Sequence, residues 1–558
     1  MSTTLPNVIN AQVVSIPSPD PTGVAAQVQV ENPRDDITLL PYQVDGVRFM
    51  LEREAVGAPI CRGGILGDDM GLGKTFQCIS LIKSSPLTTA RNLIVCPPAL
   101  VAGWTEELQA CGFSVFHLRA GKADWIAASS ESAGGRAIWV TTYPKVVYYK
   151  RDLCSQAPFD RIILDEGHCI RNGPSTERWR ACLALSNKTT CRWILSATPV
   201  QNGGTDWRNL CWWLRVTCKA HLIRTVAPII MLRRTMAELR GVLDSLPPVA
   251  AWNVHDLHIA PGTEEYAVFQ ALANQLEEAM ESRHVSTLMK LELYMRIQQF
   301  VVHPQVYIES MRRKFGTAYP RPDWNVSAGA TKWSACFAEL ASCIRKAVPT
   351  IVFCQFRTEM DMAAAEAVSM GAKVWSIRGG MTSSAVGAAV REAREVVTSN
   401  ALLASVEDRV PVVLVIQIVA GGAGLNLQFC QSILFLSQHW NPAVVHQAVG
   451  RAVRIGQRAV VQIHVFRVVD SVLENIDLRM AELHGVKVAG AQGICPTFFQ
   501  GFAPFMPLKV QEIQPVLPVV LPTGLPSASD PDPDPVDEDP SAPPPSLQVK
   551  VEAATAAA

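Results

Sequence analysis

The sequence predicts an α/β protein with two lobes, each built on a parallel sheet with helices on both faces, a helical insertion between them and disordered termini. Three observations lead to this prediction. Short β-branched runs alternate with helical patterns in two regions, the strand pattern fades between about residues 206 and 330, and both ends are rich in proline and polar residues. A chain of 558 residues with 48% hydrophobic residues suits two or three domains.

Four apolar runs in the first region are expected to be strands of one parallel sheet. They are residues 92–96, 137–141, 161–164 and 192–195. In such sheets, ligands bind at the carboxyl ends of the strands. A glycine-rich loop at 67–75 and polar segments at 165–168 and 196–199 all fall at strand ends, so the sequence predicts one ligand site there.

The segment after the first region is expected to be helical, because residues 264–302 follow a helical pattern. Its candidate core positions are Tyr266, Phe269, Leu272, Leu276, Leu288, Leu291 and Ile297. A second alternating region begins near residue 331. Its expected strands are residues 350–353, 412–416, 433–436 and 461–465.

Charge and cysteine content exclude several kinds of protein. The 50 basic and 50 acidic residues give no net charge, so any contact with nucleic acid has to come from a local stripe of charge. The fifteen cysteines include no C-x-x-C pair, which argues against a zinc module or a disulfide framework and favours reduced, mostly buried thiols. The sequence has no signal-peptide pattern and no apolar run of membrane-spanning length, so we expect a soluble intracellular protein.

The loop at 67–75 (GDDMGLGKT) has the composition of a phosphate-binding turn, although Asp68 takes the place of the usual first glycine. Residues 63–66, before the loop, have the pattern of a short apolar strand, and residues 76–82, after it, have helical spacing. This order would place phosphates at a helix N-terminus. We expect ATP phosphates to be bound by Asp68, Met70, Gly71, Leu72, Gly73, Lys74 and Thr75. Lys74 would contact the β- and γ-phosphates, and Thr75 would contact Mg²⁺. The alternative is a glycine-rich turn that binds nothing.

Two adjacent carboxylates at the end of a predicted strand complete this site. Asp165 is expected to hold Mg²⁺, largely through water, and Glu166 to orient the attacking water. ATP and Mg²⁺ are therefore the predicted cofactors.

These patterns divide the chain into five parts. We predict a disordered N-terminal tail at 1–36, an ATP-binding lobe at 37–245, a helical insertion at 246–330, a second lobe at 331–487, and a disordered acidic, proline-rich tail at 488–558. The last tail either recruits a protein partner or only keeps the chain soluble.

A series of short motifs runs through both lobes. In the first they are residues 39–47 (LLPYQVDGV), 96–100 with Trp104, 141–143 (TTY), 165–168 (DEGH), 195–202 (LSATPVQN), and 231–235 (MLRRT) with 246–248. Residues 296–300 with His303 and Pro304 lie in the predicted insertion, as a linker helix. In the second lobe the motifs are residues 352–356, 378–381, 420–427 (AGGAGLNL), 440–442 (WNP) and 446–457 (HQAVGRAVRIGQ). Together, over about residues 37–487, they resemble the Swi/Snf class of superfamily 2, which are helicase-like DNA-dependent ATPases.

The resemblance implies two RecA-like lobes, the second of the helicase C-terminal type, with ATP bound between them. It implies that Gln43 reads the adenine and that Arg451 and Arg454 are arginine fingers, which join Asp165 and Glu166 as catalytic residues. Two arginines three positions apart are otherwise most often a solvated helix face. The resemblance places DNA contacts and coupling at Thr141, Thr142, Ser196, Thr198, Gly421, Gly422, Asn426 and Gln447.

The resemblance also implies an activity and a place in the cell. The class moves along duplex DNA without sequence preference and remodels nucleosomes or other DNA-bound proteins, so chromatin remodelling, DNA repair and a nuclear location are expected. The DDM spelling at 68–70 is shared with the branch that often carries a RING ubiquitin-ligase module. No such module is expected here, because Cys211, Cys218, His221, Cys336 and Cys343 lack zinc-pair spacing.

Two alternatives stay open. One is a helicase that separates strands of DNA or RNA. The Arg233–Arg234 pair and the Gly456–Gln457 ending of the last motif argue against it. The other is a non-catalytic DNA-bound scaffold that keeps the motor fold. Against it stands the presence of the predicted phosphate ligand Lys74 and of all the predicted catalytic residues, Asp165, Glu166, Arg451 and Arg454. The basic cluster at 312–314 fits a localisation element, part of a DNA track or a solvated helix end.

Overall fold

The computed structural model describes residues 29–55, 61–86, 91–119, 121, 124–128, 136–216, 223–243, 246–282, 284–316, 319, 321–325, 329–421, 425–469 and 476–498. All of them belong to the first of two compact units, Met1–Pro507, and the second unit is Leu508–Ala558. Most of the two tails that were predicted to be disordered therefore lies outside the described residues.

The first lobe is built on a sheet whose described strands lie in the order β4-β3-β5-β2-β6-β7-β1-β8. They are β1 (Gly63–Leu66), β2 (Asn92–Cys96), β3 (Ser114–Leu118), β4 (Trp125–Ala127), β5 (Ala137–Thr142), β6 (Arg161–Asp165), β7 (Cys191–Leu195) and β8 (Met231–Leu232). Neighbouring strands are parallel, except that the edge strand β4 is antiparallel to β3. The four strands predicted in this region are confirmed as β2, β5, β6 and β7.

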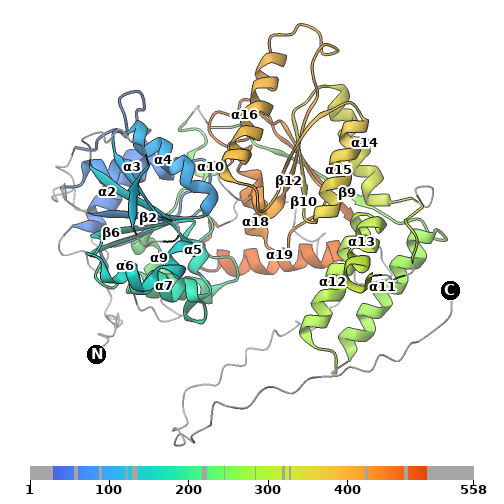
Figure 1. Ribbon diagram of the computed structural model, residues 1–558, viewed down its shortest axis with the longest axis horizontal. Coiled ribbons are helices and arrows are strands. Elements are labelled where there is room, and N and C mark those ends of the chain that lie inside the picture. Colours follow the sequence, from blue (N-terminus) through green and yellow to red (C-terminus); the bar gives the residue numbers. More distant parts are fainter. Residues whose placement is uncertain are drawn as a thin grey trace, which may run out of the picture. The chain divides into compact units, whose positions relative to one another are not determined.

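Helices cover both faces of this sheet (Figure 1). They are α2 (Pro41–Glu54), α3 (Lys74–Ser84), α4 (Val101–Ala110), α5 (Tyr143–Tyr148), α6 (Lys150–Ser155), α7 (Glu177–Leu185), α8 (Gly204–Trp213), α9 (Ile223–Ile230) and α10 (Met236–Leu239), with 3-10 turns at Pro98–Leu100, Gly167–Ile170 and Gly173–Ser175. Strand residues such as Leu66 and Ile94 pack against α2, α3 and α4. Their neighbours Ile65 and Leu93 point to the other face, against α5, α7 and α8. Burial on both faces explains why these strands read as continuous apolar runs.

The second lobe has a parallel sheet in the order β11-β12-β10-β13-β14-β9. Its strands are β9 (Ala251–Leu257), β10 (Thr350–Cys354), β11 (Lys373–Ile377), β12 (Val412–Gln417), β13 (Ser432–Phe435) and β14 (Gln462–Val468). Helices α14 (Thr331–Arg345) and α15 (Arg357–Ser369) pack on one face, and α16 (Ser383–Asn400) and α18 (Pro442–Val449) pack on the other. A short helix, α17 (Ile418–Gly421), follows β12. The two parallel-sheet lobes confirm the predicted fold class.

Strand β9 corrects the expectation that residues 246–330 are helical. It is the outer strand of the second sheet and pairs with β14 along all of its length. Its residues are half-buried, apart from Val254 and Asp256, which are exposed, because an edge strand is covered less completely than a central one. The sequence therefore lacks the buried apolar run that marks the other strands.

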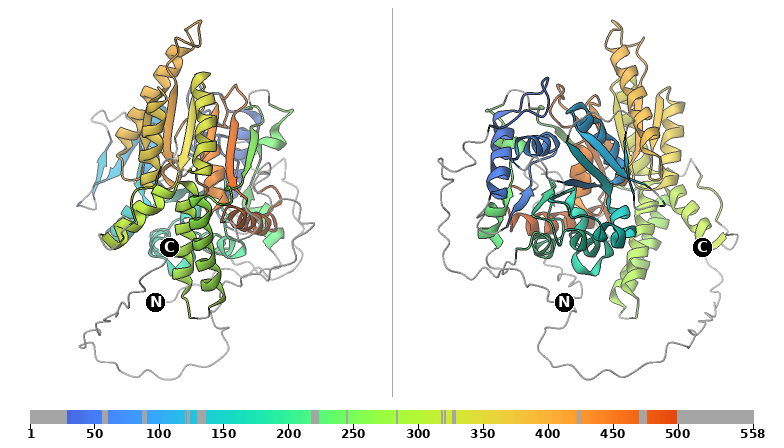
Figure 2. Two further views of the ribbon diagram at one scale, coloured as in Figure 1. Left: turned by 90° about the vertical axis from the view of Figure 1, so that its right-hand side faces the viewer. Right: turned by 60° about the vertical axis from the view of Figure 1, so that its left-hand side comes forward.

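The helical part of the insertion is formed by α11 (Glu264–Glu281), α12 (Thr287–Val302) and α13 (Pro304–Phe315). The helix expected over 264–302 is interrupted, because Ser286 caps the start of α12 by accepting a hydrogen bond from the main-chain N–H of Met289. Of the seven predicted core residues, Phe269, Leu272, Leu276 and Ile297 are buried and Tyr266 is half-buried. Leu288 and Leu291 are 79% and 54% exposed, so their prediction was wrong. Figure 2 shows α11 and α12 (green) extending together away from the second sheet.

The last described helix, α19 (Ile476–Gln492), makes contacts with both lobes. It contacts β14, α12 and α18 of the second lobe. Just after it, the main-chain oxygen of Gly493 accepts a hydrogen bond from Arg224 of the first lobe at 2.7 Å. The boundary predicted at 487/488 is therefore wrong for residues 488–498, in which Ala491 and Phe498 are buried. None of the described helices has the length and hydropathy that crossing a bilayer requires.

A buried ion pair anchors α19 to the second lobe. Lys332 Nζ lies 2.9 Å from Asp477 Oδ2, and both side chains are at most 2% exposed. Asp477 Oδ2 also accepts a hydrogen bond from the main-chain N–H of Val468, at 2.9 Å.

Replacing Lys332 with methionine removes the cation that lies 2.9 Å from the buried carboxylate of Asp477. We expect the free energy of unfolding to fall by about 3–5 kcal/mol, measured by denaturant titration followed by circular dichroism. The control is Glu177→Ala, which removes an exposed ion pair with Arg180 and should change stability by about 1 kcal/mol or less. Equal effects of the two substitutions would contradict the anchoring role.

Candidate active site

The glycine-rich loop joins β1 to α3, as the sequence predicts. Gly71 and Gly73 adopt positive φ values of 81° and 76°, which side chains disfavour. Gly73 is the N-cap of α3 and supplies no side-chain cap, so the first backbone N–H groups of the helix have no side-chain partner from that position. Such a turn at a helix N-terminus suits a phosphate group.

Lys74, the first residue of α3, turns back over the loop. Its Nζ donates to the main-chain oxygens of Asp68 and Asp69, at 2.7 and 3.1 Å. Desolvation lowers the pKa of Lys74, and the nearby carboxylates of Glu166 and Asp68 oppose this effect. An ammonium group held among carboxylates beside the loop fits the role of a phosphate ligand, so the residues present suit ATP.

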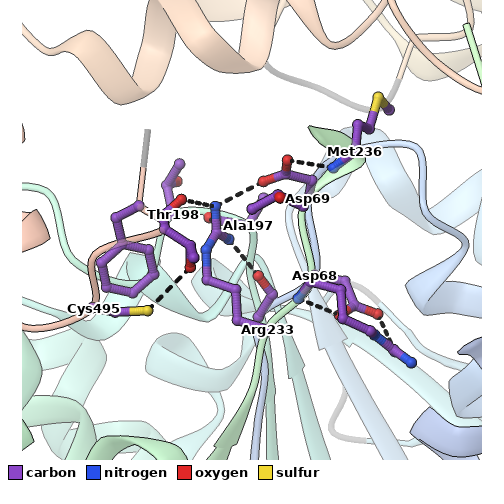
Figure 3. A network of polar contacts seen from close by, with 12 residues as sticks. Asp68, Asp69, Ala197, Thr198, Arg233, Met236 and Cys495 are labelled. Carbon is purple, nitrogen blue, oxygen red and sulfur yellow. Dashed lines mark hydrogen bonds and ion pairs between the residues drawn. The ribbon is translucent and has the colours of Figure 1, made fainter. Parts of the chain in front are cut away.

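Two ion pairs fix the loop to the segment that directly follows β8, and they account for the two aspartates of the DDM spelling. Asp68 is fully buried, and its Oδ2 lies 2.5 Å from Arg234 Nη2. Asp69 accepts from Arg233 Nη2 at 2.7 Å and from the main-chain N–H of Met236 at 3.1 Å (Figure 3). Asp68 is thus the buried counter-ion of Arg234. Its side chain is engaged there, and its predicted contact with the nucleotide stays a prediction.

Gln43 also lies against the loop. Its Nε2 donates to the main-chain oxygen of Leu72 at 3.2 Å, and its Oε1 accepts from the main-chain N–H of Leu40 at 2.9 Å. The hydroxyl of Tyr42 donates to the same Leu72 oxygen at 2.9 Å. The structure therefore brings Gln43 to the loop, and its contact with adenine stays a prediction.

The two predicted carboxylates lie at the end of β6. Asp165 accepts from the main-chain N–H of Glu166 at 3.0 Å through Oδ1, and from the indole N–H of Trp104 at 2.7 Å through Oδ2. Burial, followed by the charge of Glu166, raises the pKa of Asp165 to about 6, while Trp104 and Lys74 act in the opposite direction. Glu166 has φ 49° and ψ 47°, a left-handed conformation that is uncommon for a residue other than glycine.

A line of polar contacts, in which His168 uses Nδ1 toward both of its neighbours, leads from Glu166 to the second lobe. Its Oε2 lies 3.3 Å from His168 Nδ1, which lies 3.1 Å from Ser196 Oγ. Ser196 Oγ accepts from the main-chain N–H of Thr198 at 3.2 Å, and Thr198 Oγ1 accepts from Gln447 Nε2 of the second lobe at 3.2 Å. Three predicted coupling residues are thereby brought together. Burial would raise the pKa of Glu166, but His168 and Arg451 outweigh it and lower that pKa.

Both predicted arginine fingers face the first lobe. Arg451 faces the carboxylates of Glu166 and Asp165, and Arg454 faces the glycine-rich loop. Arg451 is 7% exposed, and burial lowers its pKa to about 10, against the opposing charges of Glu166 and Asp165. It is therefore charged at neutral pH. Arg454 lies against the loop, since a methyl group placed on Gly71 would come within 2.8 Å of Arg454 Cβ.

The residues predicted to contact DNA lie in three segments, and the structure shows the following about each. Thr141 and Thr142, at the end of β5, are 2% and 8% exposed, and Thr142 caps α5 by accepting from the main-chain N–H of Lys145. Gly421 ends α17, and Gly422 lies outside the described residues. The main-chain oxygen of Asn426 accepts from Arg394 at 3.0 Å.

The basic cluster at 312–314 is largely neutralised. Arg312 pairs with Glu309 and Asp323, and Lys314 pairs with Glu292. These ion pairs favour a helix end over a DNA track.

Three residues of the site have contacts that sequence reasoning did not assign. Arg233 binds Asp69, His168 contacts Ser196, and Trp104 binds Asp165. The fourth position of the DEGH motif could have indicated His168. The contact between Trp104 and Asp165 joins residues 61 positions apart, and no local pattern marks it.

Two protein-family models match this chain. Residues 42–221 match the SNF2-related domain, and residues 332–456 match the helicase conserved C-terminal domain. The chain is similar to a solved structure described as the Sulfolobus solfataricus SWI2/SNF2 ATPase core in complex with dsDNA, at 20% sequence identity and a TM-score of 0.35, over 83% of this chain and 97% of that one.

Relatives with similar sequences come from a virus, a bacterium and a plant. A probable global transactivator of Orgyia pseudotsugata multicapsid polyhedrosis virus is 27% identical over 76% of this chain and 85% of its own length. The putative ATP-dependent helicase/translocase YwqA of Bacillus subtilis is 26% identical, over 79% of this chain and 48% of its own length. The DNA repair protein RAD5B of Arabidopsis thaliana is 24% identical, over 77% and 45%. The chain thus spans less than half the length of the last two. With both domains matched in order, this chain belongs to the Swi/Snf family of superfamily 2 helicase-like ATPases.

Proposed function

We propose that this chain is an ATP-dependent translocase on duplex DNA that remodels protein–DNA complexes. The observation that supports it best is the line of contacts from Glu166 through His168, Ser196 and Thr198 to Gln447, because it joins a catalytic carboxylate of one lobe to the other lobe. A change at the ATP site can therefore alter the contact between the lobes, which a motor requires.

In this proposal the loop and two carboxylates bind and orient the reactants. Lys74 and the backbone N–H groups at the start of α3 hold the β- and γ-phosphates. Thr75 and Asp165 would hold Mg²⁺, largely through water, and the ion would supply positive charge against the phosphates. Glu166 orients the attacking water. Burial of the site strengthens each of these electrostatic interactions.

The second lobe completes the site in the same proposal. Arg451 and Arg454 supply positive charge where the transferred phosphoryl group develops negative charge. The segments at 96–100 and 141–142, together with the segment from Gly421 to Asn426, contact the DNA backbone, largely through phosphates, so binding is independent of sequence. The first lobe, residues 37–245, and the second lobe, residues 331–487 together with β9, move relative to each other.

The test is steady-state ATP hydrolysis by the purified chain without nucleic acid and with duplex DNA, single-stranded DNA or RNA. We expect duplex DNA to stimulate hydrolysis several-fold and Lys74→Ala to remove the activity. Displacement of a third strand from a DNA triplex, without separation of blunt or tailed duplexes, would identify translocation. Stimulation by RNA alone, or efficient strand separation, would favour a true helicase, and no stimulated turnover would favour a scaffold.

A cellular role belongs to the same proposal. One of the relatives is named as a DNA repair protein, and the family resemblance adds chromatin remodelling and a nuclear location. A fluorescent fusion of the chain that stays out of the nucleus would contradict that location.

A further inference from the structure

Trp104 holds the carboxylate that the proposed function assigns to the metal ion. It lies on α4 and is 3% exposed, and its indole N–H donates to Asp165 Oδ2 at 2.7 Å. Asp165 Oδ1 accepts from the main-chain N–H of Glu166 at 3.0 Å. Each oxygen therefore has one fixed donor. A carboxylate oxygen has more than one lone pair, so both retain acceptor capacity toward a hydrated cation.

An indole is well suited to this task. It has only two side-chain torsions, and its single N–H is a donor that cannot reverse its role. A hydrogen bond to an ionised carboxylate is about twice as strong as one between neutral groups. Because Trp104 is buried, its own N–H would be left unsatisfied if Asp165 turned away. The pair therefore favours one orientation of the carboxylate.

A second donor reaches the same residue from another segment. The hydroxyl of Tyr143, which is 2% exposed, donates to the main-chain oxygen of Asp165 at 2.8 Å. Tyr143 directly follows Thr142 at the end of β5, and Trp104 follows the segment at 96–100 at the end of β2. These two strands are paired, with Cys96 opposite Thr142.

The two donors to Asp165 thus belong to two first-lobe motifs, residues 96–100 with Trp104 and residues 141–143, which resemble the segments of the Swi/Snf class that touch the DNA backbone. Cys96 Sγ also lies 3.7 Å from the main-chain oxygen of Thr141, which ties the segments together. A shift of either segment moves a donor of Asp165. The connection needs no movement of the second lobe.

We propose that Trp104 is a positioning residue that orients Asp165 toward the metal ion and transmits DNA binding at segments 96–100 and 141–142 to the ATP site. This inference rests on the proposed function, which supplies the role of Asp165 and the DNA contacts. It assigns to Trp104 a regulatory part in the DNA dependence of hydrolysis.

The test is Trp104→Phe, which removes the N–H and keeps an aromatic ring. We expect the Mg²⁺ concentration needed for half-maximal hydrolysis to rise about 10- to 100-fold, the usual range for loss of a hydrogen bond that supports a metal ligand. Stimulation by duplex DNA at saturating Mg²⁺ should fall, while binding of a fluorescent ADP analogue in EDTA and of DNA should match the parent. If Trp104 only packed in the core, the substitution would not change the Mg²⁺ dependence and the DNA stimulation while leaving the binding of ADP and DNA unchanged.

Trp179→Phe is the matched control. Trp179 is also 3% exposed, and its N–H donates to the main-chain oxygen of Asn209 at 3.2 Å, in the same lobe. We expect it to lower stability without changing the Mg²⁺ dependence. The proposal is overturned if Trp104→Phe keeps the parent's Mg²⁺ dependence, or if Trp179→Phe shifts it equally.

Two further measurements keep the test decisive. If Trp104→Phe does not fold, Tyr143→Phe probes the same link from the other segment and should reduce stimulation by DNA; unchanged stimulation would overturn the transmission. The gain in affinity of the ADP analogue on addition of Mg²⁺ reports on Asp165 without turnover or DNA. Absent stimulation of the parent by DNA would therefore refute the proposed function, whereas an unchanged Mg²⁺ effect in Trp104→Phe would refute the positioning role.

Discussion

Replacing Glu166 with glutamine is expected to reduce ATP hydrolysis by about 10²- to 10⁴-fold, the range for loss of a general base, while ATP binding is retained. Glutamine has the same shape but cannot accept a proton from the attacking water. Glu166 directly follows β6, outside the loop that is proposed to hold the phosphates, and its Oε2 faces His168 at 3.3 Å. The substitution should therefore leave the nucleotide affinity close to that of the parent. Single-turnover hydrolysis and binding of a fluorescent ATP analogue measure the two quantities.

The matched control is Glu177→Gln, at an exposed position at the start of α7 in the same lobe. It should hydrolyse ATP at the parent rate. Turnover by Glu166→Gln near that of the control would remove Glu166 from the catalytic residues.

Replacing Arg451 with alanine is expected to lower the turnover number by about 10³- to 10⁵-fold, the range for loss of an arginine finger. The guanidinium is buried, and its charge acts on Glu166 and Asp165, so it faces the proposed reaction centre from the second lobe. With a pKa of about 10 it stays charged at neutral pH. Nucleotide affinity should change little, because the loop and Lys74 are unaltered.

Arg458 offers a control on the same lobe, because it is exposed. Arg458→Ala should hydrolyse ATP like the parent. If Arg451→Ala keeps the parent's turnover number and loses only nucleotide affinity, Arg451 acts in ground-state binding and the finger role is wrong.

The sequence predicted those parts of the fold and site that are determined by local signals. Central strands such as β2 and β6 are buried along their length and therefore read as apolar runs. The loop at 67–75 is recognisable because glycine is needed where φ is positive. Asp165 ends a buried strand and Glu166 directly follows it, which places both at the sheet's carboxyl edge.

The features that could not be predicted depend on distant partners. The half-buried strand β9 is defined by its pairing with β14, and residues 488–498 are held by first-lobe residues such as Arg224. Leu288 follows the helical period but lies on the exposed side, because a new helix begins after Ser286. The hydrogen bond between Trp104 and Asp165 likewise depends on tertiary packing.

Strand β9 has a consequence for how the chain folds during synthesis. His255 of β9 contacts His464 of β14, which is 209 positions later in the sequence. At about 5–20 residues per second, a ribosome needs roughly 10–40 s to make the intervening 209 residues. During that time the first lobe can fold, whereas β9 has no strand to pair with and is open to other strand edges. We therefore expect the second lobe to depend on chaperones that act on nascent chains at the ribosome. Nascent chains stalled before β14 should be the species most prone to aggregate.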